Sequence, residues 1–203
     1  MSRVTAQLSV SLDGYLAGPN QSLENPIGVG GLGLHTWAFP AQGAQHEVDA
    51  AVAAEVMSGL GAFVMGRNMF DPGRGPWDLS WRGWWGDDPP YHAPVFVLTH
   101  RPREPLVMKG GTTFHFVTNG VESAVQQARE AAGDLDVGIA GGASVVRQAL
   151  RAGLLEELHL HVVPVLLGAG ERLLDDVGEP ALEQVEVRSS PVAIHVRYRV
   201  VRA

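Results

Sequence analysis

Residues 139–150 read Ile-Ala-Gly-Gly-Ala-Ser-Val-Val-Arg-Gln-Ala-Leu, and this stretch decides how the rest of the chain is interpreted. The segment from Asp136 to Ala140 is typical of a short buried strand, and Ser144 begins a predicted helix. The inner side of that helix would carry its apolar residues, which are Val145, Val146, Ala149 and Leu150. Paired glycines at such a junction leave backbone N–H groups and the positive helix end open to a ligand, because no Cβ atoms stand in the way. The stretch predicts a site for a diphosphate, although a tight connection without a ligand would use the same glycines.

The composition is that of one globular domain spanning residues 1–203. A chain of 203 residues is long enough to bury about 70% of its unfolded surface. Its 15 basic and 22 acidic side chains give a net charge of −7, which argues against nucleic acid or an anionic membrane as the main partner. The absence of cysteine excludes disulfides, thiolate metal sites and thiol nucleophiles. The first residues lack an apolar signal segment and no run of about 18 apolar residues occurs, so we expect a cytoplasmic protein.

The first predicted strand, from Val4 to Val10, ends close to an aspartate. Apolar and small polar residues alternate along it, as in a strand with one buried face. Asp13 follows directly, before Gly14, and open α/β sheets place their chemistry at such strand ends. Asp13 is therefore a candidate site carboxylate, while an aspartate that only turns the loop would look the same.

A long loop and a helix come next. Residues 14–44 are rich in Gly, Pro and Asn, and Gly28 to Gly33 matches the pattern G-x-G-x-x-G. We reject a Rossmann interpretation, because no predicted strand precedes this pattern and Pro40 prevents a long helix after it. The spacing of apolar residues predicts a helix from Gln45 to Leu60, which carries Asp49 and Glu55. Carboxylates on such a helix are usually solvated.

Two more strand ends carry residues suited to phosphate. The strand from Ala62 to Met65 is followed by Gly66, Arg67 and Asn68 at the opening of a helix. The strand from Pro94 to Leu98 is followed by Thr99, His100 and Arg101, and an arginine at a strand end can hold a phosphate through a charge-assisted pair of hydrogen bonds. Between them, the loop at 72–92 carries four tryptophans, which should pack over the core, a pocket or a partner chain.

The remaining elements are predicted from period alone. They are a strand from Phe114 to Val117, a helix from Val121 to Ala131 with Asn119 as a possible cap, a strand from Leu155 to Val163, and two antiparallel strands from Leu182 to Ser189 and from Val192 to Arg202. The last strand alternates apolar residues with Ala193, His195, Arg197 and Arg199, as expected for a strand that is wet on one side.

In this order the motifs resemble the dihydrofolate reductase-like fold, in the branch that includes the reductase domain of bacterial riboflavin biosynthesis. The resemblance covers nearly the whole chain. It rests on Ser11-Leu12-Asp13-Gly14, Val64-Met65-Gly66-Arg67, Leu98-Thr99-His100-Arg101-Pro102, Gly141-Gly142 with Gln148, and the run from Leu158 to Gly170. It implies an α/β fold: a mixed, mostly parallel sheet, helices on both faces and an antiparallel C-terminal hairpin. It also implies NADPH as cofactor, and a homodimer.

The same resemblance implies roles for individual residues. The diphosphate would face Gly66, Arg67 and Asn68 and the turn formed by Gly141, Gly142, Ala143 and Ser144. Thr99, His100 and Arg101 would surround the adenosine 2′-phosphate, with Arg103 as a second possible cation. One charge-assisted contact contributes about 1.5–3 kcal/mol, which is roughly a ten- to 150-fold preference for NADPH over NADH.

The implied chemistry is hydride transfer to a C=N or C=O carbon of a small pterin- or aminopyrimidine-like substrate. A proton must then reach the heteroatom. Asp13 is the first candidate for supplying that proton or orienting the substrate, and Asp49 is a second candidate because its helix would border the same cleft. A general acid needs a raised pKa, which the sequence does not reveal. The chain has no zinc deaminase segment of the kind found in bifunctional riboflavin enzymes, so its substrate stays open.

Three alternatives remain. A metal hydrolase would use His159 and His161, which share one face of a predicted strand, but no further cluster of ligands with regular spacing accompanies them. A nucleotide-binding protein without catalysis would keep the phosphate positions and lose hydride transfer. A deazaflavin could also replace NADPH.

Overall fold

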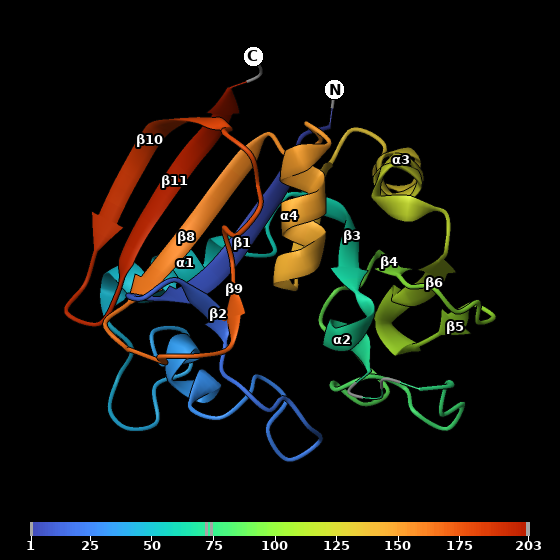
Figure 1. Cartoon of the computed structure of the whole chain (residues 1–203), viewed down its shortest axis with the longest axis horizontal. Helices are drawn as coiled ribbons and strands as arrows, with labels where there is room; N and C mark the ends of the chain where they lie inside the picture. The colour runs from blue at the N-terminus through green and yellow to red at the C-terminus, as the bar shows by residue number, and fades with distance from the viewer. Residues whose placement is uncertain (1, 72, 74, 202–203) are drawn as a thin grey trace.

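The computed structural model describes residues 2–71, 73 and 75–201, and its main element is a sheet of nine strands. Their order is β10-β11-β8-β1-β7-β3-β4-β6-β5 (Figure 1). The strands are β1 (Val4–Ser11), β2 (Tyr15–Ala17), β3 (Leu60–Gly66), β4 (Pro94–Leu98), β5 (Leu106–Val107), β6 (Thr113–Val117), β7 (Asp136–Gly141), β8 (Glu157–Val163), β9 (Glu171–Arg172), β10 (Ala181–Ser189) and β11 (Ile194–Val201). The helices are α1 (Glu47–Glu55), α2 (Arg67–Phe70), α3 (Gly120–Ala132) and α4 (Ala143–Arg151), with short 3-10 helices η1 (Gly31–His35) and η2 (Lys109–Gly111).

The centre of the sheet is parallel. β8, β1, β7, β3, β4 and β6 pair in parallel, whereas β11 is antiparallel to β8 and β10 is antiparallel to β11. The predicted mixed sheet with an antiparallel C-terminal hairpin is therefore confirmed. β2 and β9 form a separate small ribbon beside the main sheet.

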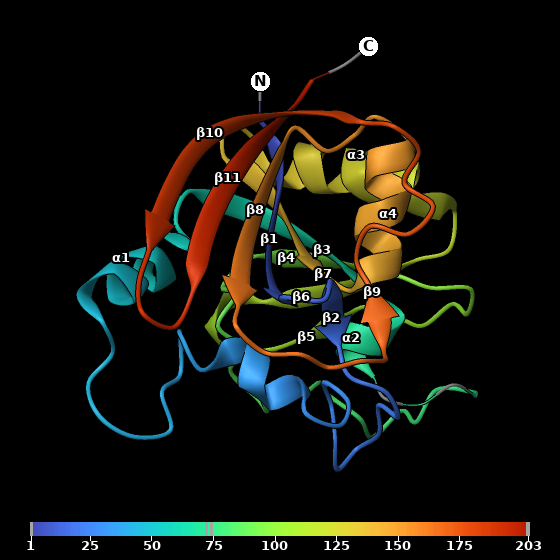
Figure 2. The same cartoon turned by 60° about the vertical axis from the view of Figure 1, so that its left-hand side comes forward.

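The two faces of the sheet are covered differently. α3 and α4 pack on one face over a large apolar core that includes Val4, Ala6 and Leu8 of β1. On the other face lie α1 and the loops around residues 18–46 and 73–92, as the two views show (Figures 1 and 2). Helices on both faces are thus confirmed. No helix in the described ranges is long and apolar enough to cross a lipid bilayer.

The tryptophan-rich loop covers a second, smaller core. Phe63, Met65 and Phe70 form this core with Val95, Val97, Met108 and Phe114, and Trp77 and Trp81 pack against it from the loop. The expectation that the loop tryptophans pack over the core is met by Trp77 and Trp81, whereas Trp85 is 56% exposed. Pro72 and Arg74 of the loop lie outside the described residues.

The sequence interpretation errs at several local points. α1 ends at Glu55 rather than Leu60, because Gly59 takes a left-handed φ of 73° and β3 begins directly after it. Asn119 precedes α3 but makes no side-chain cap hydrogen bond. β1 is buried on both faces, with Thr5 and Ser9 only 5% and 6% exposed, because α1 and its preceding loop cover the polar face. The predicted end of the last strand, Arg202, lies outside the described residues.

The chain enters and leaves at one edge of the sheet. Val4 starts β1 and Val201 ends β11, and β11 runs antiparallel to β8 while β8 is parallel to β1. Both ends of the chain therefore lie at the edge where the parallel strands begin, opposite the edge where those strands end (Figure 1).

Candidate functional site

The carboxyl ends of the parallel strands bring the three predicted phosphate motifs to one edge. Met65 of β3 pairs with Gly141 of β7, and Gly66 pairs with Leu98 of β4. A Cβ atom on Gly66 would lie 3.7 Å from the nitrogen of Gly142, so these two turns are in direct proximity. The segments that follow β3, β4 and β7 are therefore neighbours along a single edge, although they are far apart in the sequence.

The turn between β7 and α4 leaves room for a ligand. Gly141 has a φ of 128°, a region that side chains rarely allow. A Cβ atom on Gly142 would meet no described atom within 4 Å. Among the residues that the structure describes, no side chain caps the first turn of α4, although Gly142 accepts backbone hydrogen bonds from Val145 and Val146. Open space over an uncapped helix N-terminus fits an anionic group such as a diphosphate.

Arg67 lies at this edge but is held by its neighbours. Its Nη2 donates to the Gly75 carbonyl at 2.7 Å and lies 3.7 Å from Asp71, and its guanidinium stacks over Trp77 at 3.9 Å from the ring centroid. The side chain is 14% exposed. A phosphate contact by Arg67 would need an exchange of these partners, whereas the adjacent Asn68 is exposed. Both roles remain predictions.

The turn after β4 exposes one arginine and packs another against aromatic rings. Thr99 is buried, and its hydroxyl accepts the Arg101 backbone N–H at 3.1 Å, which closes the turn. His100 and Arg101 are exposed, and the Arg101 guanidinium has no partner within the described part of the chain. Arg103 instead packs among Phe70, Trp77 and Phe116 and donates to the Trp81 carbonyl at 2.9 Å. Arg101 is therefore the cation available to a ligand here.

Trp77 joins two of these turns, which the sequence did not reveal. Its ring carries the Arg67 guanidinium, and its Nε1–H donates to the Arg101 carbonyl at 3.0 Å. Only the number of tryptophans in the loop signalled a role; which one would reach the edge depends on contacts distant in sequence.

Asp13 holds a loop. Its carboxylate accepts hydrogen bonds from the Gly168 amide at 2.7 Å and the Leu167 amide at 3.2 Å. Hydrogen bonding from the Ser11 side chain, and then from these amides, lowers the pKa of Asp13 to about 2. A lowered pKa is the opposite of what a proton donor needs and argues against that role for Asp13. A role in orienting the substrate stays a prediction.

Asp49 is fully buried, contrary to the expectation that carboxylates on its helix are solvated. Its Oδ1 lies 2.8 Å from Nε2 of His195, and Nδ1 of His195 lies 2.9 Å from Nδ1 of His161. Its Oδ2 has no hydrogen-bond partner among the described residues. His195 is only 5% exposed, so the predicted wet face of the last strand is buried at this position, whereas Arg199 on the same face is exposed. Asp49, His195 and His161 are called the buried triad below.

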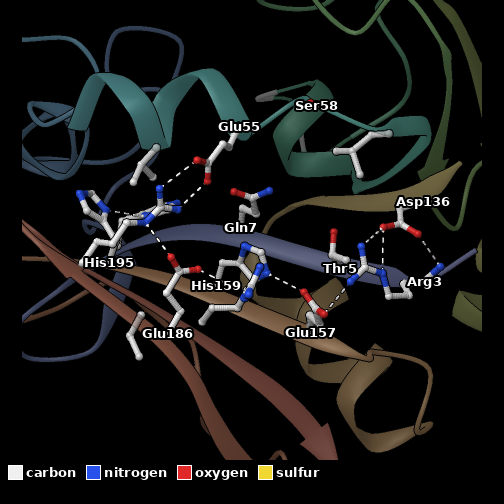
Figure 3. Close-up of a pocket in the computed structure, with 16 residues that line it drawn as sticks. Arg3, Thr5, Gln7, Glu55, Ser58, Asp136, Glu157, His159, Glu186 and His195 are labelled. Atoms are coloured by element: carbon white, nitrogen blue, oxygen red, sulfur yellow. Dashed lines mark hydrogen bonds and ion pairs between the residues drawn. The ribbon is translucent and has the colours of Figure 1, made fainter. Parts of the chain in front are cut away.

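A polar groove runs from the buried triad along the sheet beneath α1. Its volume is about 230 Å³; polar side chains of β1 and charged side chains of β8, β10 and β11 line it (Figure 3). His159 and His161 share this face, as predicted, but they do not converge: His159 lies 3.0 Å from Glu157, while His161 faces His195. The described residues contain no group of three or more side chains placed to hold a metal ion.

The sheet order, the layers and the glycine turns at one edge define the dihydrofolate reductase-like α/β fold, in which several solved structures match this chain end to end. The particular family follows from the sequence. Residues 2–196 match the model of the RibD C-terminal domain, and the chain belongs to this family. No curated protein matches the chain.

Three solved structures illustrate the similarity. A candidate riboflavin biosynthesis protein from Shewanella sp. PV-4 is 24% identical, with 100% of both chains covered and a TM-score of 0.68. A pyrimidine reductase-like protein from Corynebacterium diphtheriae is 17% identical, with 100% of this chain and 93% of that chain covered and a TM-score of 0.61. Dihydrofolate reductase from Enterococcus faecalis, in a complex with NADP(H), is 13% identical, with 98% and 96% covered and a TM-score of 0.57. At these identities the likeness establishes the fold.

Proposed function

We propose that the protein is an NADPH-dependent reductase that transfers a hydride to a C=N or C=O carbon of a small heterocycle, of the pterin or aminopyrimidine kind. Membership of the RibD C-terminal domain family supports this proposal. The observation that carries it is the register of the sheet, which sets the Gly66 turn beside both the Gly142 turn and the end of β4. A dinucleotide needs such a continuous edge.

The residues at this edge suit the two ends of the coenzyme. The open turn at Gly142 and the N-terminus of α4 would receive the diphosphate, and the free guanidinium of Arg101 would meet the 2′-phosphate. When bound, the nicotinamide supplies the hydride. The chain's own residues would position the acceptor and deliver a proton. Asp13 does not fit the role of proton donor, because its pKa is lowered.

A thermal-shift comparison of the apo protein with NADPH and NADH tests the proposal. A ligand at one hundred times its Kd stabilises the folded state by about 2.7 kcal/mol. For a domain of this size, that corresponds to a rise in Tm of roughly 5–10 °C. We expect this rise with NADPH and a much smaller one with NADH at the same concentration. No shift with either nucleotide would contradict the proposal.

The acceptor is sought in a second step. Stopped-flow absorbance of bound NADPH, mixed with dihydropterins, aminopyrimidine ribosides or small carbonyl compounds, should show oxidation with a member of one class. Binding of NADPH without oxidation by any of them would favour a nucleotide-binding protein that lacks catalysis.

We also propose that the protein is a homodimer. β10 is the outermost strand at one end of the sheet, and its face exposes apolar side chains: Leu182 is 39% exposed, Val187 is 49% exposed, and Ile194 of the neighbouring β11 is 50% exposed. An uncovered edge strand with apolar side chains favours association. Analytical ultracentrifugation should give twice the mass of the chain, and Val187→Lys should give a monomer. A monomeric wild-type protein at tens of micromolar would contradict this.

A further inference from the structure

The buried triad brings together three titratable side chains from elements that are distant in sequence. Asp49 comes from α1, His195 from β11 and His161 from β8, and each is at least 95% buried. Two of the seven buried polar atoms without a partner in the described ranges belong to it: Oδ2 of Asp49 and Nε2 of His161. Unpartnered buried polar atoms are rare, so their pairing in one cluster calls for a functional explanation.

The triad must carry a proton. The one hydrogen-bond partner of the Asp49 carboxylate in the described structure is His195, and no lysine or arginine contacts it. A buried carboxylate without a cation would cost several kcal/mol, so a proton held by the carboxylate or by His195 is needed to make the cluster neutral.

A second proton is opposed by the surroundings. Burial, first of all, and then the positive charge of His195 lower the pKa of His161 to about 3. The further groups that face His161 add to this: His159 on β8, His35 at the end of η1 and Arg188 on β10 are all potentially cationic. The triad is therefore built to hold one proton at neutral pH.

The hydrogen-bond chain allows that proton to move. If His195 carries both of its protons, its Nδ1–H donates to Nδ1 of His161, and Nε2 of His161 carries a hydrogen. When His161 gives up the proton on its Nε2, the proton on Nδ1 of His195 moves across to Nδ1 of His161. His195 then keeps one proton, on the Nε2 that faces Asp49. Both states have the same positions of the heavy atoms, so transfer requires no rearrangement of the triad.

The triad lies close to the coenzyme turn. His161 pairs with Ser9 of β1, and β1 pairs in turn with β7, which ends at the Gly141–Gly142 turn. Since neighbouring strands are about 4.8 Å apart, His161 on β8 is two strands, or about 10 Å, from the Gly141–Gly142 turn on β7. A heterocycle of one or two rings can span that interval.

We propose that the buried triad is the proton source for the proposed reduction, with His161 as the donor and His195 and Asp49 as positioning residues behind it. This rests on the proposed function. The C=N or C=O carbon gains the hydride, and its heteroatom gains the proton from Nε2 of His161. His161 regains a proton at Nδ1 from His195, and bulk water later restores the proton to His195. The substrate gains one hydride and one proton. After the transfer both imidazole rings of the triad are neutral and Asp49 is ionised.

Access to His161 requires one side chain to move. Nε2 of His161 has no exposed surface, and Trp37 packs against both imidazoles with ring centroids 4.3 and 4.9 Å away. Trp37 belongs to the loop before α1 and is tethered by its Nε1–H to the Ser9 hydroxyl at 2.9 Å. The substrate ring would take the place of the Trp37 ring.

The test is a titration of the apo protein, labelled with ¹⁵N-histidine, followed by two-bond ¹H–¹⁵N correlation NMR from pH 5 to pH 10. His161→Gln and His195→Gln assign the two rings. We expect a single step of one proton, seen together in both rings. Asp49→Asn should lower the midpoint of that step by about 1 to 3 pH units, because the opposite charge is lost. The matched control is Glu47→Gln, which neutralises an exposed carboxylate in the first turn of the same helix and should leave the midpoint in place.

Three results would overturn the proposal: no step between pH 5 and pH 10, two independent steps with midpoints like those of exposed histidines, or equal midpoints in Asp49→Asn and wild type. The titration needs neither NADPH nor an acceptor, so it is separate from the test of the reductase function. With the acceptor that the wild type reduces, His161→Gln should lower kcat by about 100-fold or more at pH 7 without changing the Kd of NADPH. An unchanged kcat would also overturn the proposal.

Discussion

Acid should destabilise this protein through His161, and the size of the effect can be worked out. An exposed histidine has a pKa of about 6.5, which describes the unfolded chain. In the folded protein, burial first and then neighbouring charges lower the pKa of His161 to about 3. The folded state thus binds fewer protons at this residue between those two values, and stability falls as the pH drops through that window. From pH 7 to pH 5, the loss from this one group is about 2 kcal/mol.

The measurement compares His161→Gln with the wild type by urea denaturation at pH 7 and pH 5. Substitution of a buried ring also removes packing, but that loss of stability is the same at both pH values. For each protein the free energy of unfolding at pH 5 is subtracted from that at pH 7, and comparison of the two results isolates the contribution of His161 protonation. We expect the wild type to lose about 2 kcal/mol more than the variant on acidification. His115→Gln is the comparison: burial also lowers the pKa of this ring on β6, but the ring is less buried, so the variant should lose a smaller share of the wild-type pH dependence than His161→Gln. Parallel pH profiles for His161→Gln and wild type would refute the reasoning.

Three further predictions concern the coenzyme edge. Arg101→Ala should weaken NADPH binding by roughly ten- to 150-fold and NADH binding hardly at all, because the free guanidinium is the cation placed for a phosphomonoester. Equal losses of affinity for the two nucleotides in calorimetric titrations would disprove that role. Gly142→Ala places a methyl group in open space, so the Tm should hardly change while both nucleotides bind roughly tenfold more weakly; unchanged affinities would show that the diphosphate lies elsewhere. Asp13→Asn should leave NADPH binding intact and speed hydrogen exchange at the Leu167 and Gly168 amides, and unaltered exchange there would disprove the loop-holding role.

The fold could be predicted because its signals are local. The parallel strands carry either a run of apolar residues or an alternation of apolar and polar ones, and both patterns are read within a few neighbouring residues. β4 was predicted with its observed bounds, Pro94–Leu98, and the four apolar residues assigned to the inner side of α4 are all buried. Helix ends were less accurate, since the end of α1 depends on the backbone conformation at Gly59.

The site could be predicted only in part, because side-chain partners come from distant segments. The sequence indicated that Arg67 and Arg101 each follow a strand. It did not indicate that Trp77 would stack on the Arg67 guanidinium while the Arg101 guanidinium stays free in the described structure. Likewise, the polar face of β1 looks wet in sequence, whereas Trp37 and α1 bury it. The buried triad was missed for the same reason: its members are separated by as many as 146 positions along the chain.

The placement of the two chain ends has a practical consequence. Because Val4 and Val201 both lie at the edge where the parallel strands begin, a reporter domain fused at either end, or an anchor to a sensor chip, would be held on the side away from the glycine turns. Immobilised protein would then present the coenzyme edge to the flowing solution. Nucleotide binding measured on such a surface should agree with binding measured free in solution, whichever terminus carries the tether.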